Sequence, residues 1–152
     1  IKDNYFLMLL PDDLIIKKNC SKDMIKVHHK HKSSVMASMK VNSKTVSRWG
    51  IYSLNKKISK NDYFIDGVVE KPSIKNAPSN KAVIGRYILP KTIFSKLAKQ
   101  KPGTGGEIHI TDAIQNLITE GEKFVAHNFL GNYLDCGTMQ GFINSNKELG
   151  KL

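Results

Sequence analysis

Apolar and polar positions along the chain predict strands and helices in alternation. The continuous apolar run at residues 5–10, followed by Pro11-Asp12-Asp13, is typical of a strand buried on both faces in the middle of a parallel sheet. Residues 21–32 carry apolar side chains at helical spacing, with Ser21 as a cap, and residues 33–41 then alternate as in a second strand. The order strand, helix, strand indicates an α/β fold.

Shorter segments continue this pattern to the end of the chain. Further strands are predicted at residues 51–54, 68–70, 82–89 and 124–129. Apolar residues recur on one helical face after Pro90, between Thr111 and Gly121, and after Thr138, with Thr111 and Thr138 as the caps of the last two helices. A helical turn at 44–49, a loop at 73–81 and a flexible link at 101–106 connect these segments.

The composition is that of one ordinary globular unit. Of the 152 residues, 40% are apolar and 24% are charged, which allows a sizeable core. No apolar stretch is long enough to cross a bilayer and no signal peptide is visible, so we expect a cytoplasmic protein without a membrane partner. Cys20 and Cys136 stand in no ligand-like spacing, which predicts free thiols rather than a disulfide or a zinc site.

The formal net charge of +11 suggests an anionic partner, either nucleic acid, a membrane surface or a phosphorylated small molecule. The lysines are scattered through every segment, and Arg48 and Arg86 are the only arginines in the sequence. Recognition of duplex nucleic acid usually relies on arginine side chains, so this distribution argues against nucleic acid as the partner.

Three local motifs carry more specific information. They are Leu10-Pro11-Asp12-Asp13 after the first strand, Val69-Glu70-Lys71-Pro72, and Leu134-Asp135-Cys136-Gly137 before the last helix. In this order they resemble the nucleotide-sugar pyrophosphorylase superfamily. Segments that match at similar intervals narrow the resemblance to the bacterial UTP-glucose-1-phosphate uridylyltransferases, or UDP-glucose pyrophosphorylases; these segments are residues 77–80, 85–89, 101–108, 111–114 and 135–137.

The resemblance covers essentially the whole chain and implies a fold and a reaction. The fold would be a Rossmann-like, GT-A-like α/β nucleotidyltransferase, with a mixed, mostly parallel sheet flanked by helices. Residues 1–152 would form the carboxyl-terminal portion of this single domain, on its sugar-phosphate and metal side. The family converts UTP and glucose 1-phosphate to UDP-glucose and pyrophosphate with magnesium, and a homo-oligomer is implied for its full-length members.

Two aspartates match the magnesium ligands of this family. Asp12 follows the first strand directly after proline, where ligands bind in open α/β sheets, and Asp135 lies on the turn before the last helix. Carboxylate oxygens are the ligands that magnesium prefers, so the resemblance assigns both residues catalytic and metal-binding roles. From the residues alone, Asp12 and Asp13 could equally end a strand and cap a helix, and Asp135 could be a solvated turn residue.

Four residues match the family's sugar-phosphate site. The resemblance implies that Glu70 accepts hydrogen bonds from glucose hydroxyls, and that Lys71, also a catalytic residue, meets the 1-phosphate. Gly50 and Gly85 match positions where the backbone approaches the glucose closely. Taken singly, an exposed strand end would explain the Glu-Lys pair, and a turn would explain each glycine.

Two other motifs are weaker. His28, His29 and His31 are close enough in sequence to suggest a metal on one helix face, but no cysteine or carboxylate stands at companion spacing, which favours an ordinary helix surface. The glycines at 103–106 lack the Lys-Ser/Thr ending of a P-loop, and in the family this segment is a structural link.

One family motif does not occur in these residues. The glycine-rich loop Gly-x-Gly-Thr-Arg, whose backbone amides hold the UTP phosphates, is absent from the sequence, and the chain opens directly on the strand expected to be central. We therefore expect that an amino-terminal part is missing and that the chain alone is inactive. A fragment, one piece of an enzyme assembled from two polypeptides, and a broken-gene product remain open. The alternative outside enzymology is a non-catalytic remnant or a basic nucleic-acid-binding protein.

Overall fold

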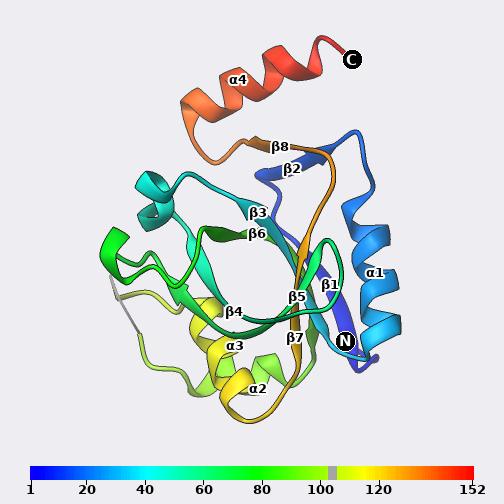
Figure 1. Ribbon diagram of the computed structural model, residues 1–152, viewed down its shortest axis with the longest axis vertical. Coiled ribbons are helices and arrows are strands. Elements are labelled where there is room, and N and C mark those ends of the chain that lie inside the picture. Colours follow the sequence, from blue (N-terminus) through cyan, green and yellow to red (C-terminus); the bar gives the residue numbers. More distant parts are fainter. Residues whose placement is uncertain (103–105) are drawn as a thin grey trace.

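The computed structural model describes residues 1–102 and 106–152, and within these residues most strands join one six-stranded sheet (Figure 1). The strand order is β1-β6-β3-β7-β5-β4. The bounds are β1 Tyr5–Leu9, β3 Ser34–Lys40, β4 Gly50–Lys57, β5 Asp62–Glu70, β6 Lys81–Pro90 and β7 Phe124–Asn128. Most of the predicted link at 101–106, including its glycines at 103 and 105, lies outside the described residues.

The sheet is mixed, as predicted, but the expectation that it is mostly parallel is wrong. Only β3 and β7 pair in parallel among the described strands, whereas β6 is antiparallel to both β1 and β3, and β5 is antiparallel to both β4 and β7. The physical reason is the short connection at residues 58–61, which turns β4 back along β5 as a hairpin.

The first strand is also placed differently from the prediction. β1 pairs only with β6 in the described sheet and lies at its edge, and its side chains are half-buried rather than buried on both faces. Leu9, for example, is 49% exposed. A continuous apolar run signals a preference for burial, but it does not reveal which strands stand beside it.

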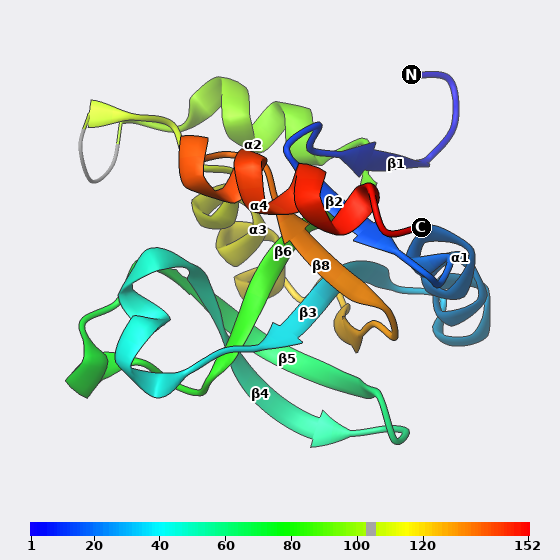
Figure 2. The ribbon, with the colours of Figure 1, turned by 90° about the horizontal axis from the view of Figure 1, so that it is seen from above.

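Helices cover both faces of the sheet and divide the core into two layers (Figures 1 and 2). On one face, α1 (Cys20–His31) packs Met24 and Val27 against Val35 and Ala37 of β3. On the other face, α3 (Ile110–Thr119) packs against β5, with α2 (Ile93–Lys99) beside it. Each helix therefore buries one apolar stripe, as the helical spacing of apolar residues predicts.

A smaller unit stands above the main sheet. β2 (Asp13–Ile16) pairs antiparallel with β8 (Asn132–Asp135), and α4 (Met139–Leu149) follows β8. The predicted cap of α4 is confirmed, since Thr138 Oγ1 accepts the backbone N–H of Gly141 at 3.0 Å. Two short 3-10 helices, η1 (Ser43–Arg48) and η2 (Ile74–Asn76), complete the elements.

Two further predictions concern local features. The prediction that Ser21 caps α1 is wrong, because α1 begins at Cys20 and Asn19 accepts the backbone N–H of Lys22. Both cysteines are free thiols, with Cys20 buried and Cys136 half-buried. Among the described helices, none has the length and apolar character needed to span a membrane.

Candidate functional site

The turn between β1 and β2 brings the first aspartates to the junction of the two sheets. Leu10 N–H donates to the carbonyl of Gly85 in β6 at 2.9 Å, so the turn begins fastened to the main sheet. Asp13 then opens β2, and the register of the small sheet pairs Asp13 with Asp135. Residues that are more than 120 positions apart in sequence thus become neighbours.

Asp12 and Asp135, the two predicted magnesium ligands, converge on one small space. A Cβ atom at Gly137 would stand 2.8 Å from Asp12 Oδ2 and 3.3 Å from Asp135 Oδ1. The turn is held by two backbone contacts: Cys136 N–H donates to the carbonyl of Asp12 at 2.7 Å, and Gly137 N–H donates to Asp135 Oδ1 at 2.9 Å. The missing side chain of Gly137 therefore leaves room beside two carboxylate oxygens.

Negative charge accumulates at this junction. Burial raises the pKa of Tyr133, and its hydrogen bond to Asp13 and the charges of Asp13, Asp135 and Asp12 raise it further. Three carboxylates acting on one phenol create a field that favours a cation nearby. The two carboxylates beside the exposed Gly137 are of the hard oxygen type that magnesium prefers.

A pocket of about 220 Å³ lies next to this junction and contains three of the predicted sugar-site residues. Gly50, Glu70 and Gly85 line it, in company with Trp49, Tyr87 and the beginning of α3. Gly50 and Glu70 face each other in the register of β4 and β5. Asp13, the neighbour of Asp12 and the register partner of Asp135, also lines the pocket, so the pocket adjoins the aspartate turn.

Glu70 is oriented within the pocket by a neighbour that sequence reasoning did not single out for this role. Thr111 Oγ1 donates to Glu70 Oε2 at 3.1 Å, and the Glu70 side chain is 21% exposed. Lys71 Nζ lies 3.9 Å from Glu70 Oε1, with its side chain 59% exposed and outside the pocket lining. Lys71 has a left-handed backbone, with φ of 43°, and its N–H donates to the Trp49 carbonyl at 3.0 Å, so the chain turns sharply here.

Gly85 is required by close packing within the protein itself. A Cβ atom there would stand 2.4 Å from Asp13 Oδ2 and 2.6 Å from Leu10 Cβ. The Gly85 N–H donates to Asp13 Oδ2 at 2.6 Å. The glycine that the resemblance assigns to glucose contact therefore also allows the aspartate turn to lie directly on β6.

Sequence reasoning missed the residues that hold the site together. Tyr133 donates to Asp13 Oδ1, and Arg86 donates to backbone carbonyls of the aspartate turn. Arg86 carried a signal, because it is one of two arginines and follows Gly85 directly. Tyr133 carried no such signal, since strands as short as β2 and β8 show no sequence pattern from which their pairing could be predicted.

The histidine cluster of α1 does not form a metal site. His28 Nδ1 lies 2.7 Å from the Ser33 carbonyl, and its ring is 4.6 Å from that of Tyr5. Across the described residues, no group of three or more histidine, cysteine or acidic side chains is arranged to hold a metal. The interpretation of these histidines as an ordinary helix surface is therefore favoured.

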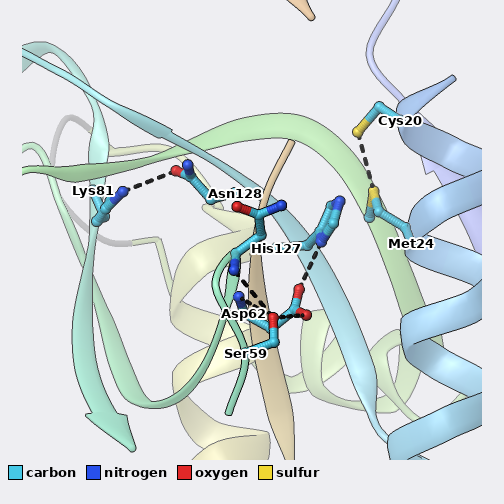
Figure 3. Close-up of polar contacts among 8 residues, drawn as sticks. Cys20, Met24, Ser59, Asp62, Lys81, His127 and Asn128 are labelled. Carbon is cyan, nitrogen blue, oxygen red and sulfur yellow. Dashed lines mark hydrogen bonds and ion pairs between the residues drawn. The ribbon is translucent and has the colours of Figure 1, made fainter. Parts of the chain in front are cut away.

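A separate polar cluster joins β5 to β7 (Figure 3). His127 Nδ1 and Asp62 Oδ1 are 2.7 Å apart, and Ser59 donates to the other oxygen of Asp62. The side chains of Asp62 and His127 are 12% and 8% exposed. Because the serine bonds to the aspartate rather than to the histidine, this is a structural link and not a nucleophile with its base.

Comparison with known proteins identifies the family of this chain. The nucleotidyl transferase family matches residues 1–151. The UTP-glucose-1-phosphate uridylyltransferase of Pseudomonas aeruginosa is 34% identical over 148 residues, 95% of this chain and 52% of the relative. The enzyme of the same name from Streptococcus pyogenes is 38% identical over 145 residues, 92% of this chain and 47% of the relative. The chain thus spans about half the length of the curated relatives that it matches.

Solved structures agree with this result. An apo UDP-glucose pyrophosphorylase superposes with a TM-score of 0.91 at 34% identity, covering 99% of this chain and 55% of that protein. A UDP-glucose pyrophosphorylase complexed with UDP-glucose gives 0.90 at 36% identity, covering 100% of this chain and 59% of that protein. The chain therefore belongs to the nucleotidyl transferase family and is similar along nearly its whole length to UDP-glucose pyrophosphorylases.

Proposed function

We propose that this chain supplies the sugar-phosphate and metal side of a uridylyltransferase, which forms UDP-glucose and pyrophosphate from UTP and glucose 1-phosphate. The observation that carries the proposal is that two features meet at Asp13. The pocket lined by Gly50, Glu70 and Gly85 adjoins the turn on which Asp12 faces Asp135. A sugar in the pocket would have its phosphate directed toward the carboxylate pair.

Glu70 is suited to bind the sugar. Its carboxylate is mostly buried and keeps acceptor capacity beside the bond from Thr111, so it can accept hydrogen bonds from glucose hydroxyls. Lys71 follows it on a sharply turned backbone, with a mobile side chain that can reach a phosphate as a point charge. We assign sugar binding to Glu70, Gly50 and Gly85, and assign both binding and catalysis to Lys71.

Asp12 and Asp135 are the proposed ligands of a magnesium ion. Their oxygens border an open space at Gly137 and are of the hard type that this ion prefers. When bound, magnesium would neutralise negative charge on the phosphate oxygens as pyrophosphate departs. The two carboxylates hold the cation at the junction, and the pocket holds the sugar that carries the attacking phosphate. Together these residues bring reactants into contact and orient them.

None of the residues assigned above to the sugar or to magnesium is proposed to hold the phosphates of UTP. The glycine-rich Gly-x-Gly-Thr-Arg loop does not occur in this sequence, so we propose that the chain needs a complementary amino-terminal polypeptide for turnover. A homo-oligomeric assembly of the complete enzyme and a cytoplasmic location stay predictions.

The experiment is a titration of the isotope-labelled chain with glucose 1-phosphate, followed by NMR. Without nucleotide we expect millimolar affinity, about 4 kcal/mol, and the first resonances to shift should be those of Val69, Glu70 and Lys71. Glucose and inorganic phosphate, titrated separately, should bind more weakly, because each makes only part of the contacts.

Matched variants make the test specific. Glu70→Gln and Lys71→Ala should weaken binding, whereas Lys75→Ala, an exposed lysine of η2, should leave it unchanged. Shifts confined to the histidines of α1, or equal binding by the wild type and Glu70→Gln, would contradict the proposed pocket. Salt-dependent retention on DNA without any response to glucose 1-phosphate would favour a nucleic-acid-binding protein instead.

A further inference from the structure

Asp13, the neighbour of the proposed metal ligand, uses both its carboxylate oxygens for contacts within the protein. Oδ2 accepts the backbone N–H of Gly85 in β6 at 2.6 Å. Oδ1 accepts the phenolic hydroxyl of Tyr133 in β8. One carboxylate therefore connects the main sheet with the small sheet, and it does so at the wall of the sugar pocket.

Arg86 fastens the backbone of the same turn. Its side chain is buried, with the residue 8% exposed, and Nη1 donates to the carbonyls of Leu10 at 3.0 Å and Gly85 at 2.8 Å. Nη2 donates to the carbonyl of Asp13. The guanidinium thus holds both ends of the segment from Leu10 to Asp13, which contains only Pro11 and Asp12 between them. The fixed φ of proline restricts this segment further.

These contacts leave Asp12 little freedom of direction. Its backbone carbonyl accepts Cys136 N–H at 2.7 Å, while its carboxylate points to the space at Gly137 opposite Asp135. Tyr133 stands two residues before Asp135 on β8, so its bond to Asp13 also ties the strand that presents the second carboxylate. Tyr133 is supported in turn by Trp49, whose ring meets it edge to face at 6.0 Å.

We propose that Asp13 and Tyr133 are positioning residues of the metal site: their hydrogen bond, together with the bond to Gly85, holds Asp12 and Asp135 at the separation that a divalent cation requires. The inference rests on the proposed function, because it takes these two aspartates as the metal ligands. Partners that orient metal ligands commonly change metal affinity 10- to 100-fold when they are removed.

The test measures divalent cation binding by the chain itself, with Mn²⁺ as the probe, because it prefers oxygen ligands as Mg²⁺ does. Paramagnetic broadening of the Gly137 amide resonance reports both the location and the affinity. Asp13→Ala removes both acceptors, and Tyr133→Phe removes the donor without adding or removing a metal ligand. Each should lower the affinity by about tenfold or more.

Asp13→Asn separates positioning from direct coordination. Asparagine can accept the Gly85 N–H with its oxygen and donate its amide N–H to the Tyr133 hydroxyl oxygen, so both connections can be kept. The positioning role predicts that Asp13→Asn retains affinity within a few fold of the wild type. Loss of affinity in Asp13→Asn equal to that in Asp13→Ala would mean that the Asp13 charge itself holds the metal, and would overturn the proposal.

Thermal unfolding followed by circular dichroism checks that each variant is folded. Unchanged Mn²⁺ affinity in folded Tyr133→Phe would also overturn the proposal, and this variant remains informative if Asp13→Ala does not fold. Asp12→Asn and Asp135→Asn serve as reference variants. If they lose Mn²⁺ binding while Tyr133→Phe does not, only the positioning role fails. If the wild type shows no broadening at Gly137, or Asp12→Asn shows no loss, the proposed metal pair and the positioning role both fail.

Discussion

At the scale of single residues, the missing side chain of Gly137 matters as much as the charges around it. The two carboxylates that we assign to magnesium face the position that a Cβ atom would occupy, at 2.8 Å and 3.3 Å. An added methyl group must displace Asp12, whose turn is fastened on both sides by hydrogen bonds. The proposed metal site therefore depends on Gly137, although this residue provides no metal ligand.

We predict that Gly137→Ala weakens divalent cation binding and leaves the fold in place. Gly137 is exposed, so the methyl group meets the carboxylates rather than the core. Mn²⁺ titration should show a loss of about tenfold, in the range expected when ligand geometry is disturbed. The matched control is Gly150→Ala, where the nearest atom would be 3.5 Å away, and its affinity should equal that of the wild type. Equal affinities of the two variants would contradict the assignment.

The two cysteines should differ strongly in reactivity. Cys20 is 4% exposed, and burial raises its pKa to about 11, against a smaller opposing effect of Arg86. Its Sγ lies 3.6 Å from Met24 Sδ inside the core. Cys136 is half-buried on the turn beside Asp135. Thiolate is the reactive form, so alkylation at pH 8 should modify Cys136 at least about tenfold faster than Cys20, as measured by mass spectrometry of the digested protein. Faster labelling of Cys20 would show that α1 opens readily.

Residue roles differed in how far they could be predicted. The pairing of Asp12 with Asp135 could be predicted, because each residue lies in a short motif of consecutive residues that matches the family. The contact of Asp13 with Tyr133 depends on strand register across more than 100 residues, which no local pattern encodes. The same holds for Thr111, which was predicted as a helix cap but lies one residue inside α3 and bonds to Glu70 instead.

At the scale of elements, the β4–β5 hairpin is fastened to the rest of the sheet by a buried polar contact. Asp62 and His127 are partners in the register of β5 and β7, and their side chains meet at 2.7 Å with Ser59 as a further donor (Figure 3). Burial alone would raise the pKa of Asp62. The hydrogen bonds from His127 and Ser59 and the nearby histidine charges outweigh this effect, and the pKa is lowered below its ordinary value of 3.8.

This shift predicts an acid-labile contribution to stability. A carboxylate with a lowered pKa in the folded state stabilises the fold fully above pH 3.8, and the contribution is lost as the pH falls through the folded pKa. Asp62→Asn should therefore lower the free energy of unfolding at pH 6 by about 1 to 3 kcal/mol, the usual range for a charged hydrogen bond. Urea unfolding at pH 6 and pH 3 measures the difference between variant and wild type.

The sign of the pH effect decides whether the prediction holds. The difference between Asp62→Asn and the wild type should shrink at pH 3, because below pH 3.8 the unfolded chain takes up a proton at this carboxyl and the advantage of the charged contact falls. Asp66→Asn is the control, since Asp66 is exposed and accepts a surface hydrogen bond from Asn55. A difference that stays constant between pH 6 and pH 3 would mean that the Asp62 contact does not depend on its charge.

Helices and paired strands were predictable to different degrees. α1 and α3 follow from apolar spacing, because each buries one stripe against the sheet. α4 also follows from its apolar spacing, but it packs on β8 and its large apolar side chains stay exposed. β2 and β8 were not predicted, since four residues each are too few to show a period, and their pairing depends on partners that are distant in sequence. The edge position of β1 was missed for a related reason. Its burial was inferred from its apolar composition, but the sheet topology determines which strands lie beside it.

At the scale of the whole molecule, the candidate site lies where the two sheets meet. β6 provides Gly85, Arg86 and part of the pocket wall, the small sheet provides the second aspartate, and the β4–β5 hairpin provides Gly50 and Glu70. Three parts of the chain thus meet at the candidate site. The relatives are about twice as long, and the edge of β1 pairs with no other described strand.

The last prediction follows from which groups carry charge in the transition state. Negative charge develops on the α-phosphate and on the departing pyrophosphate, and both belong to UTP, whose glycine-rich holder does not occur in this sequence. The chain alone, given UTP, glucose 1-phosphate and magnesium, should therefore form no measurable UDP-glucose. An amino-terminal segment of a relative, carrying the glycine-rich loop and supplied as a separate polypeptide, should restore turnover, as measured by release of pyrophosphate.

Variants of this chain, measured together with the amino-terminal polypeptide, test which part of the active site this chain contributes. Asp12→Ala and Asp135→Ala should abolish most of the turnover because they remove the proposed metal ligands. Lys71→Ala should chiefly raise KM for glucose 1-phosphate, since its ammonium is assigned to the sugar phosphate, and Lys75→Ala should behave like the wild type. Synthesis of UDP-glucose by the purified chain alone, or full activity of complemented Asp135→Ala, would refute this division of labour. We expect turnover only when the triphosphate is held beside the proposed carboxylate pair and sugar pocket, because catalysis depends on bringing the reactants together in the right orientation.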